Sequence, residues 1–337
     1  MKWMRRVFLG LMALIAALAV TAVATALRAP RPVGFETVRL PDGPGRSLAM
    51  GVWYPTDARP WPTTFAGVSL MEVARDAPVA GNSLPLVVIS HGNGGGLASH
   101  ADLALALAAQ GFVVAAPMHA GDNFADQSAV SSPDWLVNRT RELHAAIDYM
   151  LATWPSHGRI DGRRVGVYGF SAGGFTALAE IGAVPDLHLL ADHCANHPEF
   201  VCKLLSDAHS PLLSAQRIPL ASAYAHDSRI RAAVIAAPGL GFTFTPAGLR
   251  EVGVPVQLWS GSADTFVPTE SNAGAIRNGL GERAELHVVA GATHLAFLTP
   301  CGLIGPPALC RDGNGFDRKQ FHASMNAEVA AFFQSKL

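Results

Sequence analysis

The stretch Val165–Gly174 reads Val-Gly-Val-Tyr-Gly-Phe-Ser-Ala-Gly-Gly and decides the fold of this 337-residue chain. Its alternating apolar residues predict a short buried strand. The strand runs directly into Gly-x-Ser-x-Gly, with Ser171 at the centre, and a helical run follows over residues 175–181. In that setting a sharp turn lifts the serine hydroxyl clear of the sheet. An ordinary glycine-rich turn could carry the same five letters, so the rest of the chain must supply partners for the serine.

Predicted strands alternate with predicted helices on both sides of this stretch, which indicates a mostly parallel, doubly wound α/β sheet. The first two strands flank a Pro/Gly turn and should form an antiparallel N-terminal hairpin. The predicted strands are 33–40, 48–54, 86–90, 112–116, 165–170, 232–236, 254–260 and 286–289. The predicted helices are 99–110, 133–154, 175–181, 269–280 and 318–335.

One domain is expected over residues 33–337, with two inserts. Residues 183–227 separate a helix from the next strand by far more than the usual few residues, and we interpret them as a cap over the site. A second insert spans residues 300–317. Residues 55–83 look irregular, with one short helix near residues 69–75.

The first 28 residues form a separate segment. Lys2, Arg5 and Arg6 precede an uncharged run, and alternating alanines near its end offer A-x-A cleavage sites. The segment is therefore predicted to be a signal peptide, or else an uncleaved N-terminal membrane anchor. Either role places the domain outside the cytoplasm, in the periplasm or secreted.

The four cysteines agree with export. Short local loops favour the pairs Cys194–Cys202 and Cys301–Cys310 among the three possible connectivities. A metal site built from the first of these pairs with His193 and His197 fits by residue type, but an oxidising compartment favours disulfides.

Two later strand ends carry the partners that a serine nucleophile needs. Asp264 follows strand 254–260, and His294 follows strand 286–289. In a parallel sheet these ends meet at one edge. A serine hydroxyl attacks only when an imidazole takes its proton, and a carboxylate must hold that imidazole. The order Ser171, Asp264, His294 is the one expected for an α/β-hydrolase.

The turn after strand 86–90 completes the predicted site. It reads His91-Gly92-Asn93-Gly94-Gly95-Gly96 and fits neither nucleotide-binding glycine pattern. We expect the backbone N–H groups of Asn93 and Ala172 to form an oxyanion hole. His91, Gly92 and His119 are candidate substrate contacts at the same edge of the sheet.

These motifs resemble the dienelactone-hydrolase-like and platelet-activating-factor-acetylhydrolase-like group of serine α/β-hydrolases. The resemblance covers about residues 33–298. Its motifs are Val52-Trp53-Tyr54-Pro55-Thr56, Val87-Val88-Ile89-Ser90-His91-Gly92-Asn93-Gly94-Gly95, Tyr168-Gly169-Phe170-Ser171-Ala172-Gly173-Gly174, Ser262-Ala263-Asp264-Thr265-Phe266-Val267-Pro268 and Gly291-Ala292-Thr293-His294. Serine stands where dienelactone hydrolases proper have cysteine, which favours ordinary esters. The acid is placed as in the dienelactone group, so phospholipid specificity is not implied.

We therefore predict an exported serine hydrolase that cleaves small-molecule carboxylic esters without metal or cofactor. The near-neutral chain, with a formal net charge of −1, offers no basic surface for nucleic acid. Membrane contact is expected only through residues 1–28 if they are not cleaved. A serine peptidase, an acyltransferase and a catalytically silent binding protein remain alternatives. The ester itself, the cleavage of residues 1–28, movement of the cap and the oligomeric state stay open.

Overall fold

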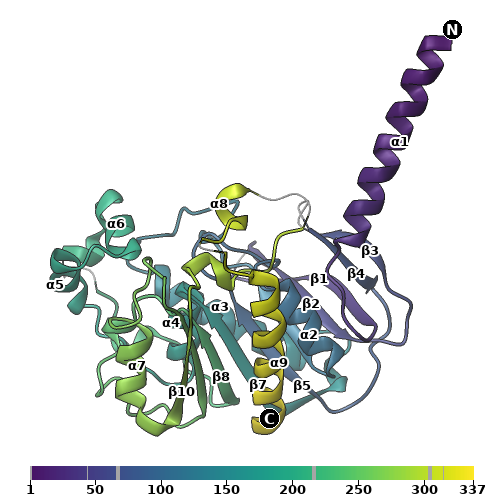
Figure 1. Cartoon of the computed structure of the whole chain (residues 1–337). Helices are drawn as coiled ribbons and strands as arrows, with labels where there is room; N and C mark the ends of the chain where they lie inside the picture. The colour runs from purple at the N-terminus through teal and green to yellow at the C-terminus, as the bar shows by residue number, and fades with distance from the viewer. Residues whose placement is uncertain (1, 44, 66–68, 215–217, 303–305, 314) are drawn as a thin grey trace.

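The computed structural model describes residues 2–43, 45–65, 69–214, 218–302, 306–313 and 315–337. Residues 1, 215–217, 303–305 and 314, which belong to the predicted N-terminal segment, cap and second insert, lie outside this description. A single ten-stranded sheet runs through the described chain (Figure 1). Its strands are β1 (Val33–Pro41), β2 (Ser47–Pro55), β3 (Trp61–Phe65), β4 (Ser69–Arg75), β5 (Leu84–Ser90), β6 (Val113–Pro117), β7 (Ile160–Phe170), β8 (Ile230–Ala236), β9 (Val256–Gly261) and β10 (Ala284–Val289).

The sheet has the order β10-β9-β8-β7-β5-β6-β2-β1-β4-β3. Strands β5 to β10 form the parallel part of the sheet, and each pairs in parallel with its neighbours there. Strand β2 is antiparallel to both β1 and β6. The antiparallel hairpin is therefore where the sequence predicts it. The chain has the α/β-hydrolase fold, with β7 near the middle of the sheet.

Helices cover both faces of the sheet. The helices of the described chain are α1 (Lys2–Ala24), α2 (Ala101–Ala109), α3 (Trp135–Ala152), α4 (Ala172–Glu180), α5 (Leu189–Asn196), α6 (Phe200–Asp207), α7 (Ala273–Leu280), α8 (Pro307–Cys310) and α9 (Arg318–Lys336). Short 3-10 turns are η1 (His157–Arg159), η2 (Pro211–Ser214), η3 (Ala221–Ala223), η4 (Gly241–Thr243), η5 (Gly281–Arg283) and η6 (His294–Phe297).

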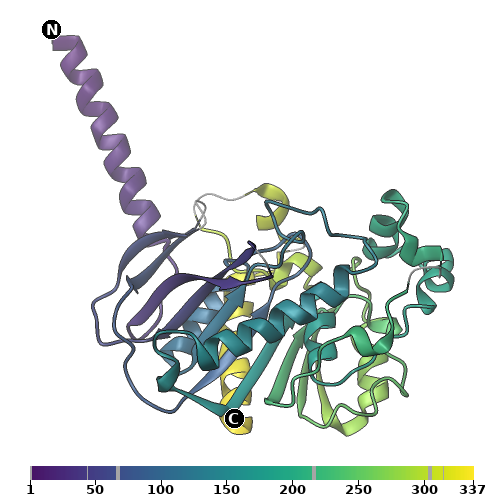
Figure 2. The same cartoon turned by 180° about the vertical axis from the view of Figure 1, so that it is seen from behind.

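The helices form two layers, and an apolar core lies between each layer and the sheet. Helices α3, α4 and α7 bury residues such as Leu143 and Phe175 against one face of the sheet. Helices α2 and α9 bury residues such as Leu107 and Phe333 against the other. In Figure 1, α9 lies in front of the sheet, and the reverse view in Figure 2 brings the opposite helical layer forward. Burial of the central strands on both faces explains why their sequences are continuously apolar.

The segment before β5 corrects one prediction. Residues 69–75 were expected to be helical, but they form β4, which pairs with β3 and with β1 at the sheet edge. Met71 and Val73 are both buried at 0–1% exposure and stand two positions apart, which is the spacing of a strand. The proline- and glycine-rich surroundings concealed this alternation.

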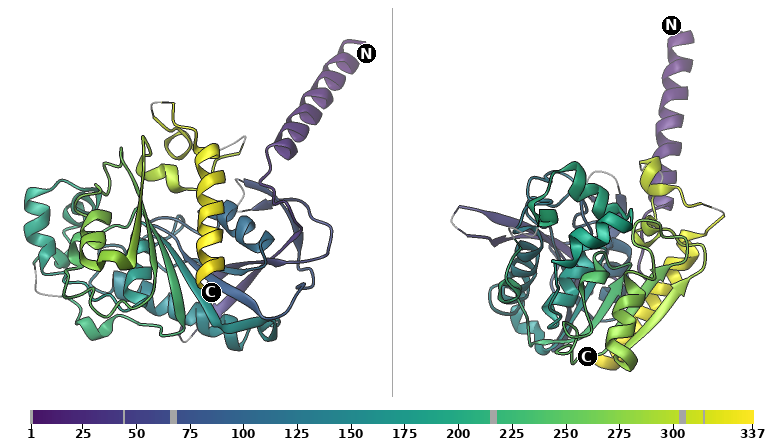
Figure 3. Two further views of the ribbon diagram at one scale, coloured as in Figure 1. Left: turned by 60° about the horizontal axis from the view of Figure 1, so that its bottom comes forward. Right: turned by 90° about the vertical axis from the view of Figure 1, so that its left-hand side faces the viewer.

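The N-terminal helix and the cap lie at opposite ends of the molecule. Helix α1 points away from the remaining chain in every view (Figure 3), whereas Leu27, just after it, pairs with Met71 and so belongs to the sheet edge. Among the residues described, no helix has the length and apolar character that a membrane span requires. Helices α5 and α6 lie in the described part of the predicted cap.

Candidate active site

Ser171 occupies a strained turn between β7 and α4. Its backbone has φ 55° and ψ −119°, a conformation that a serine adopts only when its surroundings impose it. A Cβ atom at Gly169 would collide with the backbone of Gly173, and one at Gly173 would collide with the carbonyl group of Ser90. The two flanking glycines are therefore required for the close packing of strand, turn and helix.

His294 and Asp264 lie in line with Ser171. The Nε2 atom of His294 is 2.9 Å from the Ser171 Oγ atom, and its Nδ1 atom is 2.8 Å from the Asp264 Oδ2 atom. His294 and Asp264 are each 6% exposed. The predicted partners, 93 and 123 residues away from the serine in sequence, are thus brought together at one edge of the sheet.

The Asp264 carboxylate is fixed by the loop that follows it. Its Oδ1 atom accepts hydrogen bonds from the backbone N–H groups of Phe266 at 2.9 Å and Val267 at 3.0 Å. The Oδ2 atom then accepts a hydrogen bond from the Nδ1–H group of His294. This places the Nε2 lone pair toward the Ser171 hydroxyl, the arrangement that proton abstraction needs.

The glycine-rich turn lies against the serine. Gly92 is so close to Ser171 that a Cβ atom there would stand 3.1 Å from the serine Cβ. Within the described chain, no turn or loop hydrogen bond engages the N–H group of Asn93 or that of Ala172. Both predicted oxyanion donors are therefore available to a ligand.

A buried polar network holds this turn from below. Asp122, in the loop after β6, accepts hydrogen bonds from the Asn93 side chain at 2.7 Å and from the Gly94 N–H group at 2.9 Å. Its other oxygen accepts from Trp135 at 2.6 Å and from Arg139 at 2.5 Å. Burial alone would raise the pKa of Asp122, but Arg139 and these hydrogen bonds lower it to about 2.

Arg139 is the member of this network that the sequence analysis missed. It is 1% exposed and also donates to the His91 carbonyl oxygen and, at 3.1 Å, to the Thr176 hydroxyl. It therefore joins α3 to the glycine-rich turn and to α4. In the sequence, an arginine within an amphipathic helix resembles an ordinary surface residue. Only the structure shows that Arg139 is buried.

Two predicted substrate contacts do not lie in the cavity. His119 is fully buried, with its Nε2 atom 2.9 Å from Ser90 Oγ and its Nδ1 atom 2.8 Å from Glu142 Oε2. His91 is buried as well, and its Nε2 atom accepts from the His119 N–H group. These histidines support the turn from inside. Of the three predicted contacts, Gly92 alone is among the cavity-lining residues that the structure describes.

A cavity of about 780 Å³ opens at Ser171 and His294. Its walls are mostly apolar and come from the loop after β6, the cap, the Asp264 loop and the segment after His294. The side chains that give this character include Met118, Phe124, Phe200, Phe266, Leu298 and Leu309. Such a lining suits an uncharged or long-chain ligand.

Both disulfides form with the predicted local pairing. Cys194 is bonded to Cys202, and Cys301 is bonded to Cys310. Cys301 itself lines the cavity, and Phe200, which also lines it, is two residues from Cys202. The two inserts therefore contribute to the walls of the site.

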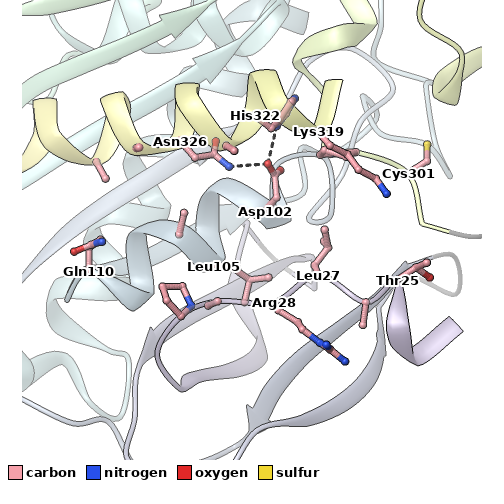
Figure 4. A pocket seen from close by; sticks show the side chains of 18 of the residues that line it. Thr25, Leu27, Arg28, Asp102, Leu105, Gln110, Cys301, Lys319, His322 and Asn326 are labelled. Carbon is pink, nitrogen blue, oxygen red and sulfur yellow. Dashed lines mark hydrogen bonds and ion pairs between the residues drawn. The ribbon is translucent and has the colours of Figure 1, made fainter. Parts of the chain in front are cut away.

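A second cavity of about 590 Å³ lies between α2, α9 and the segment that follows α1 (Figure 4). Asp102 stands at its wall and receives hydrogen bonds from His322 at 2.6 Å, Asn326 at 2.7 Å and Thr299 at 2.6 Å. The Nε2 atom of His322 is bonded to the Ala296 carbonyl oxygen in η6. This cluster ties the turn that carries His294 to the two helices on that face.

The comparisons with known proteins agree with this architecture. Residues 65–134 match the model of a family described as platelet-activating factor acetylhydrolase, isoform II. The predicted resemblance is confirmed over this stretch. The matched residues include the glycine-rich turn and Asp122, whereas Ser171, Asp264 and His294 lie outside them. That family consists of α/β-hydrolases that act on ester bonds, so the match supports a serine ester hydrolase in general. No curated protein matches the chain.

Proposed function

We propose that the protein is an exported serine hydrolase that cleaves carboxylic esters through an acyl-enzyme. The observation that supports this most directly is the hydrogen-bonded line from Ser171 through His294 to Asp264, with distances of 2.9 and 2.8 Å. The line ends at a mostly apolar cavity that Asn93, one of the two proposed oxyanion donors, also lines. The disulfides fit the oxidising compartment that the proposal requires.

The reaction proceeds in two halves. In the first, the Ser171 oxygen attacks the ester carbonyl carbon while its proton moves to Nε2 of His294. The N–H groups of Asn93 and Ala172 stabilise the negative charge that develops on the carbonyl oxygen. His294 then gives the proton to the leaving alkoxide, and the acyl group remains on Ser171. In the second half, His294 takes a proton from water, which attacks the acyl group, and Ser171 regains its proton as the acid leaves.

The cavity suggests the class of ester. Its apolar lining offers contact area to a hydrocarbon acyl or alcohol group, and the arginines among its described lining residues are Arg75 and Arg318. Arg318, at the cavity, is already paired with Asp312 at 2.7 Å. We therefore expect uncharged esters of medium or long chain to be better substrates than cationic ones.

A fluorophosphonate probe and a series of p-nitrophenyl esters test this function. The wild-type protein should react with the probe at Ser171 and hydrolyse the esters, and Ser171→Ala should do neither. Ser47→Ala, which changes an exposed serine on β2, is the matched control and should retain both reactions. A wild type that is inert to probe and esters would leave the binding-protein alternative, and faster turnover of aminoacyl amides would indicate a peptidase.

A further inference from the structure

Three ionisable residues meet where the cap joins the domain. His144 lies on α3, Glu180 is the last residue of α4, and Asp227 precedes β8. The residues between Glu180 and Asp227 include the whole predicted cap. The backbone N–H group of Asp227 donates to the Glu180 carbonyl oxygen at 2.8 Å, so both ends of the cap are held together here.

The Glu180 carboxylate lacks a hydrogen-bonding partner within the described chain. Its side chain is 0% exposed, and neither of its oxygens makes a hydrogen bond there. The closest cationic group is the His144 ring, whose Nδ1 atom is 3.8 Å away from Oε2, too far for a hydrogen bond. A buried carboxylate without a partner is costly, which indicates that a ligand supplies what the protein does not.

The spacing of the three donor atoms suits a metal ion. The His144 Nδ1 atom is 3.4 Å from Asp227 Oδ2 and 3.8 Å from Glu180 Oε2. All three ligand atoms lie within 4.8 Å of one another. Two ligands that bind one tetrahedral zinc at its usual bond lengths stand about 3.3–3.5 Å apart. Slight closure of these side chains around an ion would therefore give zinc-like geometry.

The surrounding charges favour a divalent cation. Besides Glu180 and Asp227, the cluster contains Asp148, and among the described residues Arg229 is the arginine bonded to both aspartates. With His144 neutral, three carboxylates face one guanidinium, so a net charge of −2 remains.

We propose that His144, Glu180 and Asp227 bind one divalent cation of the zinc type, with water as a further ligand, and that this ion fastens the base of the cap to α3. His144 is about one-third exposed and provides access for the ion. Asp227 accepts from three Arg229 donors, its backbone N–H, Nε–H and Nη2–H groups, which leaves one of the about four acceptor positions of a carboxylate for the ion. Glu180 and Ser171 stand at opposite ends of α4, about 13 Å apart along the helix, so the site is separate from the proposed catalytic one.

Zinc binding to the full-length, disulfide-intact protein tests the proposal. After treatment with EDTA and desalting, the wild type should take up one zinc per chain, and its thermal unfolding temperature should rise. Glu180→Gln and His144→Gln should each lower the affinity by at least about 100-fold. Glu270→Gln on an exposed loop and His197→Gln on the cap are matched controls that should keep it.

The fold of the variants provides a second readout. The Glu180→Gln protein should fold as well as the metal-free wild type, since it loses a buried unpaired charge. A wild type that binds no zinc at micromolar concentration, or equal binding by Glu180→Gln, would overturn the proposal.

Discussion

The side-chain amide of Asn93 donates a hydrogen bond of 2.7 Å to the carboxylate of Asp122. Asn93 thereby contributes in two ways, since its side chain anchors the glycine-rich turn while its backbone N–H group remains free for the substrate. The same carboxylate binds the N–H group of Gly94 and is itself held by Arg139. The oxyanion donor that we propose is thus preorganised by a buried ion pair.

Asn93→Ala should lower kcat about tenfold with little change in KM. The substitution keeps the backbone N–H group but removes its anchor, so the loss should fall below the 10²–10³-fold cost of deleting an oxyanion donor. Steady-state kinetics on a p-nitrophenyl ester measure it. Asn278→Ala on the exposed side of α7 is the matched control and should behave as the wild type. A change in KM alone would assign Asn93 to ground-state binding instead.

Ser171→Ala and His294→Ala should each lower kcat at least several thousandfold. The double variant should be hardly worse than either single one, because the two groups act in the same proton transfer. Asp264→Asn should cost less, though still a large factor, because it disturbs only the orientation and charge of His294. Near-full activity of Asp264→Asn would show that another carboxylate holds the histidine.

Much of this site could be predicted from local sequence because each part follows a recognisable strand. Ser171 and Asp264 come after strands that end in buried residues, His294 follows the partly exposed edge strand β10, and parallel strands bring their carboxyl ends to one edge. What strand ends do not reveal is the direction of a side chain. His119 follows β6 at the correct edge, yet its ring turns inward to Glu142 rather than into the cavity.

The parts that could not be predicted depend on contacts between distant segments. Asp102 and His322 are 220 residues apart and meet only because α2 and α9 cover the same face of the sheet. Strand β4 is stabilised by its partners β1 and β3 rather than by a strong propensity of its own. In both cases tertiary packing, which one sequence does not display, decides the outcome.

The free energy of unfolding of the wild type should fall as the pH rises, and Glu142→Gln should remove this fall. Burial raises the pKa of Glu142 to about 8, and its neighbour His119 has its pKa lowered by burial, so the pair is neutral at pH 7. Because the unfolded glutamate ionises near pH 4.5, the native state binds the extra proton between pH 4.5 and 8, and stability declines across that window.

Urea unfolding from pH 5 to pH 9 measures this effect. The wild type should lose about 2–4 kcal/mol across the window relative to Glu142→Gln, whose amide can still bond to His119. Glu270→Gln, at an exposed position, should follow the wild-type curve. Parallel curves for Glu142→Gln and the wild type would mean that Glu142 is ionised in the native protein at neutral pH.

Phe200→Ala should raise KM for long-chain esters several-fold and leave kcat for short ones unchanged. The Phe200 ring stacks on Phe266, with centroids 5.1 Å apart, and both line the cavity. The adjacent Glu199 fixes this part of the cap by accepting a hydrogen bond of 3.0 Å from Asn272. A chain-length series with Phe332→Ala as a remote control separates lost apolar contact from general destabilisation. Equal KM values for all chain lengths would place the acyl group elsewhere.

The last prediction concerns the two disulfides, of which Cys301–Cys310 borders the cavity and Cys194–Cys202 packs against the apolar core under the cap. Cys301 lines the cavity directly, and the Cys194–Cys202 bond closes the loop that carries Phe200. The described residues of the second insert include no buried side chain, whereas the cap buries Leu190, Val201 and Leu205, so a covalent bond has its larger effect on the order of the second insert. Reduction should therefore raise KM and change chain-length selectivity at temperatures where the domain is still folded.

Kinetics and circular dichroism with and without a phosphine reductant test this order of events. The Cys301→Ser/Cys310→Ser variant should reproduce the effect at the cavity mouth, with a stability loss of about 2–3 kcal/mol or less, as expected for a short loop. The Cys194→Ser/Cys202→Ser variant should act mainly on long esters, through Phe200. Loss of secondary structure at the same reductant concentration as the rise in KM would show instead that the bonds support the whole fold.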